Sequence, residues 1–157
     1  MNIFILDLDL EKCATYHVNK HVVKMCVEYA QLLCNAHHIS GSESSIPYKL
    51  THKNHPCSVW VRECIENYKW LCDLALFLCK EYRIRYDKIH KSEAVIKWAK
   101  KNQPNLKSLK SLTKFAIAMP AECQLDTAVN SYRNYYIQEK KHIAEWRRRS
   151  VPEWFEI

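Results

Sequence analysis

Apolar residues recur at helical spacing through most of the chain, and capping residues mark where the repeats begin. Asp9 and Asp126 are suitable N-caps for two long helices, and Pro56 suits the first turn of a third. Ser92 begins a shorter amphipathic stretch. The pattern predicts an all-α, single-domain bundle over residues 1–157, with three long helices and two short ones. The predicted helices cover 10–37, 57–85, 92–103, 108–118 and 126–148.

The segments outside these helices are few. Residues 3–8 are extended and apolar, so we expect an N-terminal arm tucked against the core, and residues 40–54 are expected to form a loop. Gly41 is the single glycine of the chain. Tight hairpin turns require glycine at positive φ, so this composition argues against a sheet-rich fold.

One polar line runs along the otherwise apolar first helix. Its members follow each other at steps of three and four residues, which confines them to roughly 80° of the helix surface. Two imidazoles, an amine and a carboxylate share it, and such groups support proton transfer near neutral pH. The line is therefore a candidate catalytic cleft, while the alternative is a solvent face with an ordinary Lys24–Glu28 pair. Its residues are His17, His21, Lys24, Glu28, Gln31 and Asn35.

Eight cysteines occur without a Cys-x-x-Cys pair, and four of them recur at helical spacing among large apolar residues. This arrangement favours buried free thiols over disulfides or a zinc cluster, and it implies a reducing, intracellular compartment. No apolar run is long enough to cross a membrane, and residues 1–8 are too short and too acidic for a secretory signal.

The net charge of +7 is concentrated in one block. Residues 83–114 contain ten basic residues against two acidic ones, with Tyr82, Tyr86 and Trp98 interleaved or adjacent. A basic block with aromatic residues is typical of a surface that binds the phosphate backbone of a nucleic acid, and DNA is the expected partner. The alternative is a lysine-rich solvated face. Lys140, Lys141 and Arg147–Arg149 form a second basic cluster.

Two further segments add candidate phosphate ligands. The loop 52–56 precedes a predicted helix N-terminus, where unpaired N–H groups attract anions, although His55 or Asn54 can equally be only a cap. Arg133 lies among tyrosines of the last helix, whose simpler interpretation is core packing. The complete set of candidate nucleic-acid ligands is His52, His55, Arg83, Arg85, Lys97, Lys100, Lys101 and Arg133.

A metal site is an alternative use of the polar line. His17 and His21 stand four residues apart, the spacing of helical zinc sites, and a bound zinc or iron ion would activate water for hydrolysis. A third ligand would have to come from elsewhere. The candidates for it are Glu28, His52, His55 and His90, of which Glu28 lies nearly two turns from His21. We expect no cofactor, with zinc or iron as the alternative.

The order of features along the chain resembles the pyrimidine-dimer DNA glycosylases of the phage endonuclease V type, which are small, basic, all-α proteins. The resemblance spans most of the chain and depends on sparse matches. The matching segments are Ala14-Thr15-Tyr16-His17, Asn67-Tyr68-Lys69-Trp70-Leu71, Met119-Pro120-Ala121-Glu122 and Pro152-Glu153-Trp154-Phe155.

The resemblance implies DNA repair chemistry, in which a free N-terminal amine attacks the sugar, a glutamate of the first helix assists, and β-elimination cleaves the backbone. His17 is the polar site residue that carries over. Lys24 stands where the family has its glutamate, and Glu28 is the nearest acid, one turn further on. Asn2 is larger than the residues that normally permit removal of Met1.

We therefore expect an enzyme that acts on nucleic acid, with His17, His21, Lys24 and Glu28 as its catalytic residues. In the glycosylase version the target base leaves its stack, and Trp98 or Tyr86 supports it. Two alternatives remain: a metal-dependent hydrolase using His17 and His21, and a non-catalytic binding module whose affinity comes from lysine.

Overall fold

The computed structural model describes residues 1–42 and 45–155, and within these ranges the chain forms helices and no strand. The prediction of an all-α fold is confirmed. Residues 43–44, which belong to the predicted loop 40–54, lie outside the described residues, as do 156–157. The elements are α1 (Leu10–Tyr16), α2 (Asn19–Ser40), α3 (Pro56–Val61), α4 (Ile65–Tyr86), α5 (Glu93–Lys101) and α6 (Ala128–Glu139), with two short 3-10 helices, η1 (Ala121–Cys123) and η2 (Lys141–Ile143).

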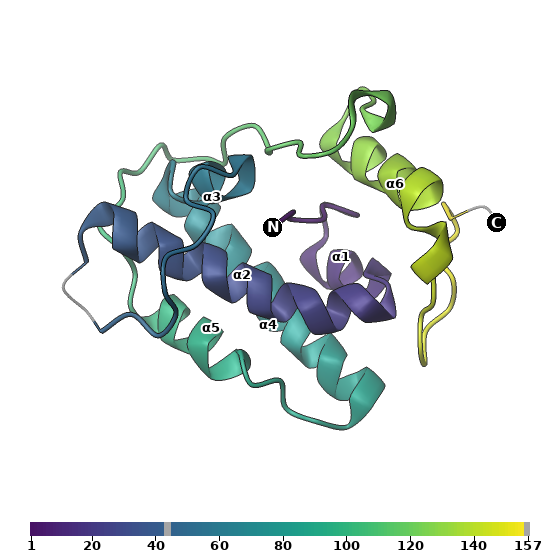
Figure 1. Cartoon of the computed structure of the whole chain (residues 1–157), viewed down its shortest axis with the longest axis horizontal. Helices are drawn as coiled ribbons and strands as arrows, with labels where there is room; N and C mark the ends of the chain where they lie inside the picture. The colour runs from purple at the N-terminus through teal and green to yellow at the C-terminus, as the bar shows by residue number, and fades with distance from the viewer. Residues whose placement is uncertain (43–44, 156–157) are drawn as a thin grey trace.

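The two longest helices, α2 and α4, have 22 residues each and pack against one another at the centre of the molecule (Figure 1). Helices α1 and α5 pack on α4, and α5 also contacts α2. Both central helices place apolar residues on the faces that meet, so their burial supplies much of the driving force for folding. Examples of these fully buried residues are Leu32, Leu33, Leu71, Leu74 and Leu78.

The N-terminal segment is extended and passes between α2 and α6 (Figure 1). Residues 3–6 are buried, which confirms the predicted arm for that part of its length, whereas Leu8 is exposed. Phe4 is at the middle of this layer, with ring contacts to Tyr132, Tyr135 and Tyr136 of α6. The segment therefore supplies the apolar surface that joins α6 to the helices at the centre.

The predicted helix 10–37 is interrupted. It is two helices, α1 and α2, separated at His17 and Val18, whose ψ angles of 132° and 156° are extended. The carbonyls of Thr15 and His17 accept hydrogen bonds from the buried Arg85 guanidinium, at 2.7 and 2.8 Å. Arg85, from another helix, thus bonds to carbonyls that would accept backbone N–H groups if the helix were continuous. Apolar periodicity alone does not reveal such a partner.

The predicted helix 57–85 is also interrupted, by residues 62–64 between α3 and α4. Asn67 explains the interruption, because its side-chain amide donates to the Trp60 carbonyl at 2.8 Å and its oxygen accepts from the Thr113 backbone N–H at 3.1 Å. Asparagine competes in this way with helical backbone bonds. Residues 93–101 do form the predicted short helix α5.

The predicted helix 108–118 is wrong, since this stretch has no regular structure. Its backbone N–H groups bond to side chains of α4 instead of to one another: the Glu66 carboxylate accepts from Leu109 and Lys110 at 3.1 and 3.0 Å. A hydrogen bond from the Ser108 side chain is the largest cause that lowers the pKa of Glu66 to about 2, and the bond from the Leu109 N–H acts in the same direction.

The predicted last helix, 126–148, is shorter than expected, because α6 ends at Glu139 and only the turn η2 follows. Beyond it Trp146 turns into the core, where its indole N–H donates to the Tyr16 carbonyl at 2.8 Å and its ring meets Phe155. The bundle therefore has two long helices rather than the three expected. The side chains of α6 predicted to face inward, Tyr132 and Tyr136, are fully buried.

All eight cysteines are free and buried, which confirms their expected role as small apolar core residues. No helix in the described part of the chain is both long and apolar enough to span a membrane.

Candidate functional site: the N-terminal amine and the outer face of α2

The α-amine of Met1 lies beside a carboxylate at the middle of α2. Its nitrogen is 3.0 Å from Glu28 Oε2, and Lys24 Nζ is 3.5 Å from Oε1 of the same residue. The Met1 and Glu28 side chains are only 6% and 13% exposed. Partial burial strengthens such a charge pair relative to one in open water, because less solvent screens it.

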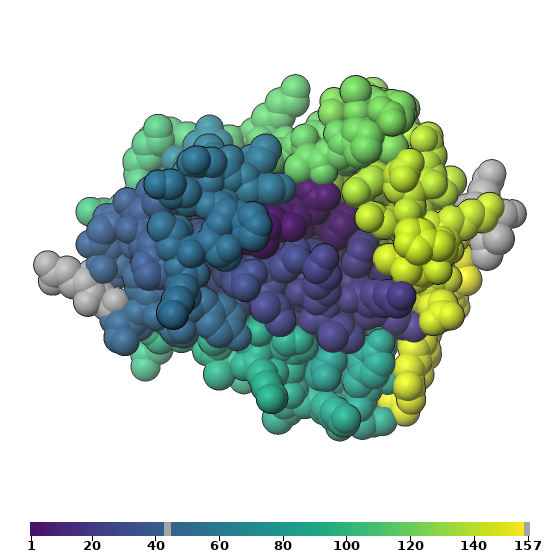
Figure 2. Space-filling model, in the orientation of Figure 1, coloured from purple at the N-terminus to yellow at the C-terminus, as the bar shows by residue number. Residues whose placement is uncertain are grey.

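The position of the amine follows from the path of the N-terminal segment. The segment runs between α2 and α6, and its first residue lies beside Glu28, on the face of α2 that α4 does not cover (Figure 1). In Figure 2 the purple atoms of the N-terminal segment are visible at the floor of a depression between residues near 50–60, the green segment before α6, and α6 itself.

His21 lies two turns before Glu28 on α2. Its ring stacks on Phe4 with centroids 4.3 Å apart, and its Nδ1 is 2.7 Å from the Tyr136 hydroxyl. Burial lowers the pKa of His21 to about 3, and the nearby charges of Lys140, Lys24 and the Met1 amine act in the same direction. His21 is therefore neutral at physiological pH, within the electrostatic field of the amine.

His55 lies at the N-terminus of α3 and caps it, because its Nδ1 accepts the Cys57 backbone N–H at 3.1 Å. Burial lowers the pKa of His55, the charges of the Met1 amine and His52 lower it further, and Glu28 acts in the opposite direction. His55 thus caps α3, and the charge of the Met1 amine acts on its ring. His52 is exposed and bonds to Thr51.

His17 is not part of this group, although the sequence placed it on the same face as His21. It lies in the break between α1 and α2, is fully buried, and is bonded at both nitrogens: Nδ1 donates to the Cys13 carbonyl at 2.7 Å and Nε2 is 2.9 Å from the Tyr29 hydroxyl. Burial lowers the pKa of His17 to about 4. Its place in the structure is that of a neutral core histidine.

The alternative metal pair of His17 and His21 would need a free nitrogen on each ring, and both nitrogens of His17 are hydrogen-bonded here. Across residues 1–42 and 45–155, no group of three or more His, Cys, Asp or Glu side chains is placed to hold a metal ion.

Two of the expected phosphate ligands are committed elsewhere. Arg85 is fully buried, where its guanidinium bonds to Glu81, Asn19 and two backbone carbonyls, so it cannot face a nucleic acid. Arg133 donates to the Leu6 carbonyl at 2.7 Å and pairs with Asp7 at 2.9 Å, which holds the N-terminal segment against α6. The sequence led us to expect both arginines at the surface, because it does not show which groups surround an arginine in the fold.

The lysines of α5 are exposed but distant from the amine. Figure 1 shows α5 on one side of α2 and the N-terminus on the other. Lys97 and Lys101 are solvent-exposed, whereas Lys100 pairs with Asp73, and Arg83 pairs with Glu93. The expected basic segment 83–114 is therefore not one surface beside the polar line of α2.

Lys140 is a residue that the sequence reasoning left out of the site. It follows α6, its ammonium lies 4.9 Å from the centre of the Tyr135 ring, and its charge acts on His21. The signal for it was the second basic cluster at 140–149, but nothing in the sequence indicated that the end of α6 lies near α2.

The described arrangement suits proton transfer at an amine. Glu28 can accept a proton from the Met1 amine, which becomes a nucleophile when it is neutral. Lys24 contacts Glu28, and Lys140, His21 and His55 add further groups of positive or neutral charge to this part of the structure. Such a balance favours an anionic ligand.

Comparison with known proteins adds no relative to this picture: no protein-family model, no curated protein and no solved structure matches the chain.

Proposed function

We propose that the protein is a DNA glycosylase with lyase activity, in which the α-amine of Met1 is the nucleophile and Glu28 takes its proton. The observation that carries the proposal is the 3.0 Å pair between the amine and Glu28 in a partly buried position. A carboxylate there is the group that amine-based attack on a sugar requires, and the resemblance to the phage endonuclease V type points to the same pair of groups.

The resemblance had left the acidic partner unclear, since Lys24 occupies the counted position of the glutamate. In the fold, Glu28 is the acid that meets the amine, and Lys24 contacts the other oxygen of that carboxylate. The displacement by one helical turn keeps the acid on the same face of α2. This supports Glu28 as the functional counterpart of the family's glutamate.

The proposed reaction takes place at one deoxyribose of the DNA. The neutral amine attacks C1′ and displaces the base, which leaves with its bonding electron pair and takes up a proton, while the new amine nitrogen loses one. The C1′–O4′ bond then opens, O4′ takes up a proton, and the nitrogen lone pair forms the imine between Met1 and the sugar. Removal of a 2′ proton then expels the 3′ phosphate by β-elimination. Glu28 is placed to accept the first proton, and Lys24 and Lys140 supply positive charge for the DNA backbone.

Borohydride trapping tests the proposal directly. The protein is incubated with a labelled duplex that contains one abasic site, with sodium borohydride, and the covalent adduct is measured on a denaturing gel. The mass of the intact protein is measured first, to establish that the chain begins at Met1 with an unmodified amine. The wild-type chain should form an adduct.

Glu28→Gln should lower the trapping rate by about 100-fold or more, because a positioned proton acceptor contributes that much to such steps. Glu145→Gln is the matched control, since this glutamate is exposed and its change should leave the rate unaltered. Binding of the duplex without any adduct from the wild-type chain would reject the glycosylase and favour a non-catalytic nucleic-acid-binding module.

A further inference from the structure

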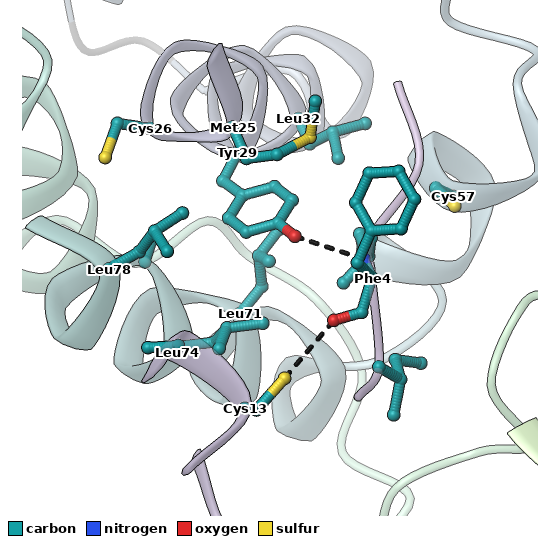
Figure 3. Close-up of a cluster of buried hydrophobic side chains, with 14 of the residues drawn as sticks. Phe4, Cys13, Met25, Cys26, Tyr29, Leu32, Cys57, Leu71, Leu74 and Leu78 are labelled. Atoms are coloured by element: carbon teal, nitrogen blue, oxygen red, sulfur yellow. Dashed lines mark hydrogen bonds between the residues drawn. The ribbon is translucent and has the colours of Figure 1, made fainter. Parts of the chain in front are cut away.

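Three contacts hold the N-terminal segment in one register. The Phe4 backbone N–H donates to the Tyr29 hydroxyl at 3.1 Å, and the Cys13 thiol donates to the Phe4 carbonyl at 3.2 Å (Figure 3). Further along, the Leu6 carbonyl accepts from Arg133 at 2.7 Å. These bonds lie within a layer whose side chains, residues 3–6, are at most 3% exposed.

Tyr29 is the best defined of these contacts. Because the Nδ1 atom of His17 donates to a carbonyl and the ring is neutral, its Nε2 must accept, so the Tyr29 hydroxyl donates to His17 at 2.9 Å and accepts from Phe4. The hydroxyl thus both donates and accepts a hydrogen bond, and Tyr29 is fully buried. It therefore fixes where Phe4 stands relative to α2.

The same helix carries the partner of the amine. Tyr29 and Glu28 are neighbours on α2, and they bind residues 4 and 1 of the extended segment. The distance from the Phe4 anchor to the amine is thus set by the number of residues between them. In an extended chain each residue adds about 3.3–3.6 Å of length. A shift of the register by one residue also turns every side chain to the opposite face.

A shift of register is costly for this segment. Phe4 stacks on His21 at 4.3 Å and contacts three tyrosines, so a shift by one residue would expel that ring from the core. The segment will keep its register when its end is lengthened or shortened. The amine of such an altered chain then lies about 3.5 Å from its place beside Glu28.

We propose that the Phe4–Tyr29 anchor makes the site selective for the α-amine of residue 1 and no other, and that Tyr29 is the positioning residue for that amine. This inference rests on the proposed function, because it specifies which amine reacts. It requires that Met1 remains on the chain and unblocked, so that formylation or acetylation of Met1 switches the site off. Asn2, a large residue, is consistent with retention of Met1.

The first test compares three proteins that differ only in where the chain begins. One begins at Met1, one at Asn2, and one carries a glycine before Met1; each is released from a cleavable fusion, and its start is verified by intact mass. The Met1 chain should be trapped on abasic DNA at least about 100-fold faster than the other two, since a misplacement of 1 Å alone can cost that factor.

The second test uses Tyr29→Phe, with Tyr48→Phe as its matched control, because Tyr48 also loses a hydroxyl contact but bonds to Ser92, away from the N-terminal segment. Loss of the anchor should lower the trapping rate at saturating DNA by roughly tenfold, with unchanged affinity for DNA. It should also shrink the preference for the Met1 chain over the glycine-extended chain. A role in stability alone would lower both rates equally, which would overturn the proposal.

A stability measurement separates this inference from the proposed chemistry. In the Met1 chain, Glu28→Gln should lower Tm by at least about 3 °C, since it removes the partner of the amine. In the Asn2 and glycine-extended chains the same substitution should lower Tm much less, because Glu28 has already lost the amine and only its contact with the exposed Lys24 is removed. Equal losses in all three chains would overturn the register inference. Absence of any adduct with this Tm pattern intact would reject only the glycosylase.

Discussion

At the scale of single residues, the buried charges decide stability. The Glu81 carboxylate accepts from Arg85 at 2.8 Å and from two nitrogens of Arg149, also at 2.8 Å. Arg85 is fully buried, and Glu81 is nearly so. Burial alone would raise the pKa of Glu81, but the hydrogen bonds from Arg149 and Arg85 outweigh it, so the pKa is lowered and the carboxylate stays charged.

Glu81→Gln should lower the free energy of unfolding by about 3–5 kcal/mol, because it leaves the Arg85 guanidinium buried without a counter-charge. Urea denaturation followed by circular dichroism measures the change. Glu11→Gln is the control, since Glu11 forms an exposed pair with Lys80 and its loss should cost less than about 1 kcal/mol. Equal effects of the two substitutions would contradict this assignment.

The two histidines of the first thirty residues make stability depend on pH. Burial lowers the pKa of His17 to about 4 and that of His21 to about 3, from an ordinary value near 6.5. The unfolded chain therefore binds more protons than the folded chain below pH 6.5. Their contribution is fully present above pH 6.5 and is lost as the pH falls toward the folded values.

Between pH 7 and pH 5 the free energy of unfolding should fall by about 4 kcal/mol, or about 2 kcal/mol for each histidine. Urea unfolding at several pH values checks the slope. His21→Gln should remove about half of this pH dependence and keep the fold. A slope unchanged by that substitution would show that His21 is not buried in its neutral form.

At the scale of elements, helix ends were harder to predict than helices. Apolar periodicity located α2, α4 and α5, and Asp9 does cap α1 by accepting the Lys12 N–H at 2.9 Å. The interruptions at His17 and at residues 62–64 depend on Arg85 and Asn67, which lie in a neighbouring helix or beyond the break. Such partners are tertiary, so local sequence contains no signal for them.

Helix α2 ends at the single glycine of the chain. Gly41 has φ of 74°, and nothing lies within 4 Å of the place that a Cβ atom would occupy. Gly41→Ala should therefore destabilise the protein by about 1 kcal/mol through backbone strain alone, without a steric clash. Gly41→Asn should cost less, since asparagine tolerates this conformation; thermal unfolding of both variants measures the difference, and an equal cost would contradict the assignment.

At the scale of the whole molecule, charge lies on two sides of α2. The sequence showed how much positive charge the chain has, but not that α5 and the N-terminus would be separated by a central helix (Figure 1). The polar line likewise predicted Lys24 and Glu28 as neighbours and missed that the first residue of the chain would meet them. That contact joins residues 27 positions apart, which periodicity cannot link.

Under the proposed function, this arrangement predicts which lysine contributes to DNA binding. Lys140→Gln, beside the site, should weaken binding of an abasic duplex several-fold and lower the slope of log affinity against log salt by about 0.9, the value for one lost phosphate contact. Lys97→Gln, on exposed α5, is the matched control and should change neither. The reverse outcome, measured by fluorescence anisotropy, would favour a binding module that uses α5.

The buried N-terminal segment also has a practical consequence for recombinant work. An affinity tag placed ahead of Met1 replaces the charged nitrogen beside Glu28 with a neutral peptide bond. The added residues would also have to leave the space between α2 and α6 that encloses the N-terminal segment. Under the proposed function, a tagged preparation would fold and purify but form no adduct with DNA, so the trapping assay needs protein whose chain begins at Met1.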